Sequence, residues 1–246
     1  MKYLLFGLIV LTVSISSSGM NGATSCVIRQ HSGSAETDDW VITVLNSFVP
    51  PFTTNIRGLD FIEPNSIFFI SGTEYKLYQC KADDGSYENE WSLDPANSLP
   101  YGMANSGTYA NVNDFGDMVV YYYNGSSWST YSNPTGDDGR GMDFDGTHIW
   151  ESYDIGGTYG VCAFDDSGTY YGHWVLSEIP SQPSGLAVFD PGTGNIGIAV
   201  TTYSTHNIWF YELDGSSMNY LGMGALPGGA SQSLGLCYSD TRGTFF

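Results

Sequence analysis

Two arginines hold the same position in a phrase that recurs along the chain, and the chemistry they offer is anion binding. Arg57 and Arg140 each precede a glycine and a large apolar residue, in RGLDF and RGMDF. The chain has seven Lys and Arg against 26 Asp and Glu, so a repeated guanidinium is conspicuous. A guanidinium binds a carboxylate through two parallel hydrogen bonds. The pair therefore predicts a site for a carboxylate or another anion, with local pairing to Asp60 and Asp143 as the alternative.

Motifs for metals and nucleophiles are missing from the sequence. The four histidines lack the close spacing of a zinc site, and the four cysteines do not cluster with them. No Gly-x-Ser-x-Gly elbow is present. Several Asp-Gly pairs are compatible with structural calcium, but tight hairpin turns need the same residues, and none has the pattern of an EF-hand. We therefore expect no cofactor, with structural calcium as the alternative.

The recurring phrase also indicates the elements that must position these side chains. Its glycines are 39 to 50 residues apart, a period typical of radially repeated folds. Few charged residues (13%), many aromatic residues (15%) and 31 glycines favour short strands joined by tight turns. The sequence therefore predicts an all-β protein, a β-propeller. The five copies of the phrase are RGLDF (57–61), YGMAN (101–105), RGMDF (140–144), SGLAVF (184–189) and LGLCY (234–238).

Each repeat divides into four short strands, a to d. In the first repeat these are 57–63, 66–71, 75–82 and 87–93. Four repeats carry an Asp-Gly or Asn-Gly type of turn between strands c and d, at 83–85, 124–125, 165–168 and 214–215.

The fifth repeat is incomplete, and the beginning of the chain supplies the missing part. It has only strands a (235–239) and b (243–246), whereas 25–31 and 39–45 resemble a c–d hairpin. We therefore predict five four-stranded blades, with the closing blade shared between the N- and C-terminal segments. Such closure removes open sheet edges. The alternative is a truncated module of a larger surface protein.

The predicted blades place the candidate ligand-binding residues at one mouth of the central channel. In a propeller the d–a connections and the b–c loops share one face, and loops from every blade surround the channel there. The candidates on the d–a connections are Arg57, Tyr101, Arg140 and Ser184, and those on the b–c loops are Glu74, Asp114, Asp154, Tyr203 and His206.

Charge and the N-terminal segment bound the partners and the location. A formal net charge of −19 excludes nucleic acid and disfavours anionic membrane surfaces. Lys2, the apolar stretch 4–13 and the small residues 14–19 predict an export signal, too short to span a bilayer. We expect a signal peptide over 1–22 and one propeller domain over 23–246. The mature chain is predicted to be a monomer that is secreted, periplasmic or on the cell surface, with no membrane insertion.

The cysteines and tryptophans have structural interpretations. Cys80 and Cys162 lie on c strands of repeats that are not neighbours, and Cys26 and Cys237 are two strands apart in the closing blade. Two strand spacings are about 9.6 Å, beyond the reach of a disulfide. We therefore expect buried free thiols. The six tryptophans are expected to pack between blades, with one or two near loops left to stack on a glycan.

Two segments resemble known propeller families. GRGMDFDGTHIWESYD (139–154) is similar to the Gly-Leu-Ala-x-Asp-Gly-x-x-Leu-Trp phrase of secreted bacterial β-propellers of the NHL-like and streptogramin-lyase-like superfamily. IWESYDIGGTYG (149–160) resembles a Tyr-Glu-Ser-x-Gly stretch of plant-type glutaminyl cyclases, which are exported and five-bladed. The second resemblance implies Glu151 as a general acid/base. Lyase chemistry of the first kind would use a histidine and a Mg²⁺-binding acid, and only His206 is placed for it.

These observations predict an exported, non-catalytic propeller that binds a carbohydrate or a protein partner through its loop-rich channel face. The enzyme alternative is a glutaminyl-cyclase-like or lyase-like propeller. The cyclase family carries Gln or Glu directly before the Gly-Leu of particular repeats, where this chain has Arg57, Tyr101, Arg140, Ser184 and Leu234.

Overall fold

The fold consists of antiparallel four-stranded sheets. The computed structural model describes residues 23–30, 40–50, 55–136, 138–226 and 234–246, and every regular element within them is a β-strand. Blade 1 comprises β3 (Ile56–Ile62), β4 (Ser66–Ser71), β5 (Lys76–Lys81) and β6 (Tyr87–Ser92). Blade 2 comprises β7 (Pro100–Asn105), β8 (Ala110–Asp114), β9 (Val119–Tyr123) and β10 (Trp128–Ser132). Blade 3 comprises β11 (Gly139–Phe144), β12 (Ile149–Ile155), β13 (Thr158–Phe164) and β14 (Tyr170–Val175). Blade 4 comprises β15 (Pro183–Phe189), β16 (Ile196–Thr202), β17 (Asn207–Asp214) and β18 (Ser217–Ala225).

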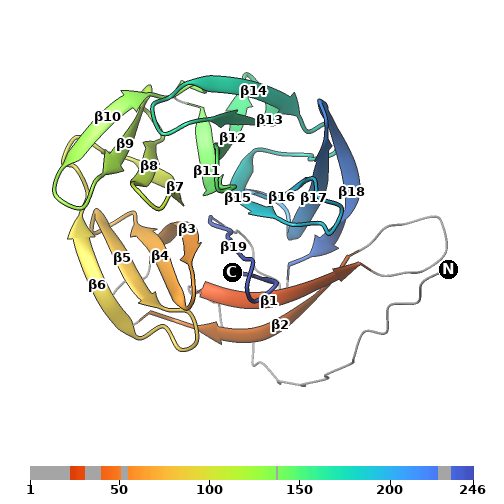
Figure 1. The fold of residues 1–246 in the computed structure, drawn as a ribbon, viewed down its shortest axis with the longest axis horizontal. Coiled ribbons are helices and arrows are strands. Elements are labelled where there is room, and N and C mark those ends of the chain that lie inside the picture. The colour runs from red at the N-terminus through yellow and green to blue at the C-terminus, as the bar shows by residue number, and fades with distance from the viewer. Residues whose placement is uncertain (1–22, 31–39, 51–54, 137, 227–233) are drawn as a thin grey trace.

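The sheets stand around a common centre, which confirms the predicted all-β propeller. In each of blades 1 to 4 the first strand is innermost and the fourth lies at the periphery (Figure 1). The predicted c–d turns are also present, because Gly85, Gly125, Gly168 and Gly215 all have positive φ, between 61° and 88°. Positive φ is what a tight hairpin requires and what glycine supplies without strain.

The glycine of the recurring phrase is needed because neighbouring inner strands nearly touch. A Cβ on Gly58 would lie 2.7 Å from the carbonyl oxygen of Tyr101 in the next blade, and one on Gly141 would lie 2.5 Å from the amide nitrogen of Leu186. A Cβ on Gly235 would lie 2.9 Å from a side-chain carbon of Leu59. The period in the sequence therefore records the close approach of backbones around the channel.

Strands from both ends of the chain form a further sheet, in the order β19 (Tyr238–Ser239), β20 (Thr244–Phe245), β1 (Ala23–Gln30) and β2 (Trp40–Phe48). The register joins the two halves at one residue pair, Cys26 with Phe245. The four blades built of consecutive strands establish the propeller. The fifth sheet has the strand composition that the closing blade requires, and the count of five blades stays a prediction.

The C-terminal hairpin β19–β20 packs between blade 4 and blade 1. Phe245 contacts Phe189 edge-on, with 5.4 Å between ring centroids, and belongs to the core cluster of blade 4. Phe246 stacks on Phe61 of blade 1, with 4.9 Å between ring centroids. The last residues of the chain thus contribute apolar surface to both neighbouring blades.

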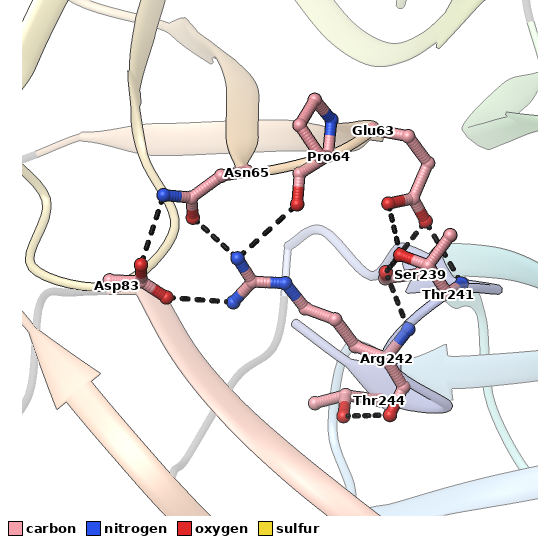
Figure 2. A network of polar contacts seen from close by, with 8 residues as sticks. All are labelled: Glu63, Pro64, Asn65, Asp83, Ser239, Thr241, Arg242 and Thr244. Atoms are coloured by element: carbon pink, nitrogen blue, oxygen red, sulfur yellow. Dashed lines mark hydrogen bonds and ion pairs between the residues drawn. The ribbon is translucent and has the colours of Figure 1, made fainter.

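A polar network fastens the same hairpin to blade 1 (Figure 2). Arg242 forms an ion pair with Asp83 at 2.8 Å and donates to the side-chain oxygen of Asn65 at 2.5 Å. On the other side Glu63 accepts hydrogen bonds from Ser239 at 2.7 Å and from the amide of Thr241 at 3.1 Å. These contacts join segments about 160 to 178 residues apart in the chain.

The structure also bears on the cysteines and tryptophans. Cys80 and Cys162 are buried free thiols, as predicted, and Cys237 is buried as well. The indole N–H groups of three tryptophans, Trp40, Trp128 and Trp174, donate to backbone carbonyls of a neighbouring blade. Their acceptors are Leu221, Ser92 and Ser216 respectively, which confirms that these tryptophans connect blades.

The predicted signal peptide lies outside the described residues. Within the described part of the chain, no helix has the length and hydropathy needed to cross a membrane.

Candidate functional site

Arg57, Tyr101 and Arg140 occupy equivalent places at one mouth of the channel. Each is the second residue of an innermost strand: β3, β7 and β11 respectively. These strands belong to consecutive blades and lie side by side at the centre of the ring (Figure 1). Two guanidinium groups and one phenol therefore lie on adjoining blades.

Arg140 is a buried cation that forms no ion pair with a carboxylate among the described residues. Its guanidinium lies over the ring of Phe115, 3.8 Å from the centroid, and donates one hydrogen bond to the carbonyl oxygen of Gly139 at 3.1 Å. The residue is only 3% exposed, and no ion pair within the described residues involves it. Burial lowers its pKa, and the electrostatic effects of Tyr101, Asp154, Asp138 and Glu151 oppose this shift without an ion pair being formed. A buried charge is normally neutralised by a partner, so the surroundings of Arg140 favour an added anion.

Arg57 mirrors this arrangement with greater exposure to solvent. Its guanidinium lies 6.0 Å from the ring centroid of Tyr101 and donates to the carbonyl oxygen of Pro100 at 3.1 Å. Among the described residues no carboxylate pairs with it. Burial raises the pKa of Tyr101 to about 12, against the opposing effect of the charges on Arg140 and Arg57. Tyr101 therefore stays a neutral phenol between two cations.

The alternative pairing of the arginines with Asp60 and Asp143 is wrong. Each aspartate accepts a backbone N–H from the following blade: Asn105 donates to Asp60, and Val188 donates to Asp143 at 2.6 Å. Each aspartate lies three positions further along the extended strand than its arginine, a distance of about 10 Å. The two kinds of side chain therefore lie at opposite ends of the channel.

Of the remaining predicted ligand-binding residues, some are hydrogen-bonded within the protein and others are exposed to solvent. Asp114 is buried and accepts the amides of Ser98 and Leu99, at 2.6 and 3.0 Å. Asp154 accepts from Gly157 and Gln182, and the hydroxyl of Ser184 pairs with that of Thr201. Glu74 is exposed in the β4–β5 turn and accepts from Ser71, while Tyr203 is 43% exposed and His206 is exposed in the β16–β17 turn.

Glu151, the residue implied as general acid/base, is fully buried between blades 2 and 3. Its carboxylate accepts hydrogen bonds from Asn113 at 2.6 Å, from Asn133 at 3.1 Å and from Thr135 at 2.6 Å. Asn113 also donates to the backbone carbonyl of Arg140 at 2.7 Å. Burial raises the pKa of Glu151 to about 7, although its hydrogen bonds and the charge of Arg140 oppose this shift. The carboxyl group can therefore exchange a proton near neutral pH, but it is 0% exposed.

The strand register shows that Glu151 occupies a position at which blades 1, 2 and 4 have an apolar residue. It pairs with Met142 of the innermost strand, and the corresponding residues of the other three blades are Phe69, Val112 and Val200. The polar partners Asn113, Asn133 and Thr135 were not predicted, because they come from a strand and a connection of a different blade.

Carboxylates surround the opposite mouth of the channel, which sequence reasoning also missed. A cavity of about 390 Å³ lies where the innermost strands end, and its acidic lining residues are Asp60, Glu63, Asp143, Asp145, Asp190 and Asp240. Burial raises the pKa of Asp60 to about 7. Burial and the charge of Asp60 raise the pKa of Asp143 well above its ordinary value. The sequence does carry a signal for these carboxylates, namely the Asp of RGLDF and RGMDF. The alternative prediction treated these aspartates as ion-pair partners of Arg57 and Arg140.

Both buried aspartates fit because the next blade has a small residue at the same position. Ala104 follows Asp60 around the ring, and Ala187 follows Asp143. Both alanines are fully buried. No group of three or more His, Cys, Asp or Glu side chains suited to a metal ion occurs in the part of the chain that the structure describes.

Comparison with known proteins shows the fold. No protein-family model matches the sequence, and no curated protein is significantly similar to it. Glutaminyl cyclase from Myxococcus xanthus has a TM-score of 0.58 and 15% identity, over 78% of this chain and 84% of that chain. A chain of the nidogen/laminin complex has a TM-score of 0.57 and 14% identity, over 88% and 82%. Virginiamycin B lyase from Staphylococcus aureus, in a structure with quinupristin, has a TM-score of 0.52 and 13% identity, over 81% and 64%. All three share the β-propeller fold with this chain, and they include both enzymes and a protein complex.

Proposed function

We propose that this chain is an exported, non-catalytic β-propeller that binds a carbohydrate or protein partner through an anionic group at the mouth lined by Arg57, Tyr101 and Arg140. The observation that carries the proposal is the buried guanidinium of Arg140, which lies on Phe115 and has no carboxylate partner among the described residues. A carboxylate of the ligand would neutralise this charge and use the free N–H donors of both arginines.

The aromatic residues at this mouth supply the second element of recognition. Phe115 is 39% exposed and Tyr203 is 43% exposed, and Tyr101 lies against Phe115 with 6.2 Å between ring centroids. Aromatic faces next to cations are suited to a ligand with both an apolar body and a charged end. The matched chain of the nidogen/laminin complex gives a precedent for a propeller within a protein complex.

The proposal is tested by screening the mature protein against acidic and neutral glycans and against peptides with a free or amidated C-terminus. We expect binders among the acidic members, and loss of binding in Arg57→Gln and Arg140→Gln. Arg140→Lys keeps the charge without the planar fork and should bind with intermediate strength. Lys81→Ala, a change at an exposed cation outside the mouth, is the matched control. Equal binding by the wild type and by both Gln variants would refute the proposal.

A glutaminyl-cyclase-like enzyme is the second candidate, favoured by the pKa of about 7 at Glu151. A carboxyl group of that pKa is suited to general acid/base catalysis at neutral pH. Conversion of a peptide with an N-terminal glutamine, lost in Glu151→Gln, would support it. No conversion by the wild-type protein would remove it and leave Glu151 as a link between blades.

A further inference from the structure

A second cavity lies between blades 1 and 2, on the face opposite the arginines. Its volume is about 310 Å³. The a–b turn of blade 2 contributes Thr108 and Tyr109, the c–d hairpin contributes Tyr123, and blade 1 contributes Phe68 and Trp91. We name it the blade 1–2 cleft.

Aromatic side chains dominate the walls of this cleft and rest on a buried apolar base. Phe68 and Trp91 meet at 64° with 5.6 Å between ring centroids. Together with Tyr123 they are half-buried and pack against a core cluster that includes Leu77 and Met103. The walls are therefore supported from below, and the open sides of the rings are available to a ligand.

The indole of Trp91 differs from the indoles that connect blades. Trp128, the neighbouring tryptophan, donates its N–H to the carbonyl oxygen of Ser92 at 2.9 Å. No hydrogen bond of the Trp91 indole is found among the described residues, and the same holds for the hydroxyl groups of Thr108 and Tyr109. Each of these groups can bond to a ligand without breaking a contact within the protein.

The charge of the cleft restricts the ligand. None of its lining residues is ionisable at neutral pH, although the chain has 26 Asp and Glu. A charged ligand would find no ion partner there, and a wholly apolar ligand would leave the polar groups at the rim without partners. A sugar ring has an apolar face that stacks on aromatic rings and hydroxyl groups that bond at its edge. A volume of about 310 Å³ is at the small end of the range for ligand sites.

We propose that the blade 1–2 cleft binds a neutral hexose unit of a glycan, stacked on Trp91 and hydrogen-bonded at its edge by Thr108 and Tyr109. This site is independent of the anion site at the channel mouth. It lies on the other face of the ring and contains neither arginine, so the two proposals fail separately.

The test uses maltotriose, cellotriose and N-acetylchitotriose as probes at millimolar concentrations, followed by saturation-transfer NMR and tryptophan fluorescence. We expect at least one of them to bind the wild type, with affinity reduced about tenfold or more in Trp91→Ala. Thr108→Arg places a long side chain in the cleft from an exposed position, without altering the core, and should have the same effect. Trp174→Ala, which removes a tryptophan that connects blades 3 and 4, is the matched control and should bind as the wild type does.

Four results would overturn the proposal. One is that no neutral trisaccharide binds to the wild type. Another is that a trisaccharide binds equally well to Trp91→Ala and Thr108→Arg. The third is that the cleft takes up an apolar dye in a manner blocked by Thr108→Arg while the sugars do not compete. The fourth is that Arg57→Gln loses sugar binding while Trp91→Ala and Thr108→Arg keep it, which would assign the sugar to the channel mouth.

Discussion

Replacing Asp60 by asparagine should reduce the loss of stability that the protein undergoes as pH rises. Asp60 is buried at the channel mouth that is lined by carboxylates, and it accepts the backbone N–H of Asn105. Asparagine keeps an oxygen for this hydrogen bond but carries no charge. The variant therefore removes the ionisation of the buried carboxyl group and preserves the contact between blades.

The expected size of the effect follows from the pKa of Asp60, which burial raises from 3.8 to about 7. The folded state binds the proton more tightly than the unfolded state does, so stability is greatest below pH 4 for this group and falls as pH rises toward 7. The difference between the two pKa values corresponds to about 4 kcal/mol for complete ionisation. Asp143 acts in the same direction, because burial and the charge of Asp60 raise its pKa as well.

The assay is urea unfolding followed by tryptophan fluorescence between pH 4 and pH 8. The wild type should lose stability across this range, whereas Asp60→Asn should lose about 4 kcal/mol less and be the more stable protein at pH 8. Part of the decrease in the free energy of unfolding with pH remains in both proteins, because Glu151 also has a pKa of about 7. Asp214→Asn, at an exposed hairpin turn, is the control and should follow the wild type. Parallel profiles for the wild type and Asp60→Asn would refute the assignment of a proton-binding carboxyl group at this mouth.

Three other predictions concern the scaffold. Gly141→Ala should destabilise the protein by about 2 to 3 kcal/mol in urea unfolding, since its Cβ would lie 2.5 Å from the backbone of blade 4; an unchanged midpoint would contradict this explanation of the repeat. Arg242→Ala should cost about 1 to 2 kcal/mol, mainly through its hydrogen bonds to Asn65 and Pro64, while Lys81→Ala should change little. Cys80 and Cys162 should not react with a thiol reagent at pH 8 until the protein is denatured, because burial raises the pKa of both thiols, that of Cys80 to about 12; rapid reaction of the native protein would show that their strands open.

Much of the architecture could be predicted because its signals are local or periodic. Asp83, Asp84 and Gly85 predict a hairpin turn within three residues. The glycine of the recurring phrase indicates one steric requirement that is repeated around the ring. The position of Arg57 and Arg140 at the same mouth followed from that period. These inferences needed only the chain order and the alternation of strand direction.

The partners of these residues could not be predicted, because they depend on contacts across blades. The bond between Asp60 and Asn105 joins residues 45 apart, and its geometry depends on the small Ala104 of the next blade. Likewise, Phe115 follows Asp114 in a short turn, and nothing in the sequence indicates that its ring lies under Arg140. Pairing arginine with the nearest aspartate ignored the extent of strand that separates them.

Side-chain NMR tests most directly whether Arg57 and Arg140 form a site for a carboxylate. The ¹H–¹⁵N resonances of the arginine Nε–Hε groups are followed while sodium acetate is added at an ionic strength held constant with sodium chloride. We expect saturable shifts of the Arg57 and Arg140 resonances and none at Arg242, which already has Asp83 as its partner. Absence of saturable shifts at both arginines, or equal shifts at all three, would contradict it.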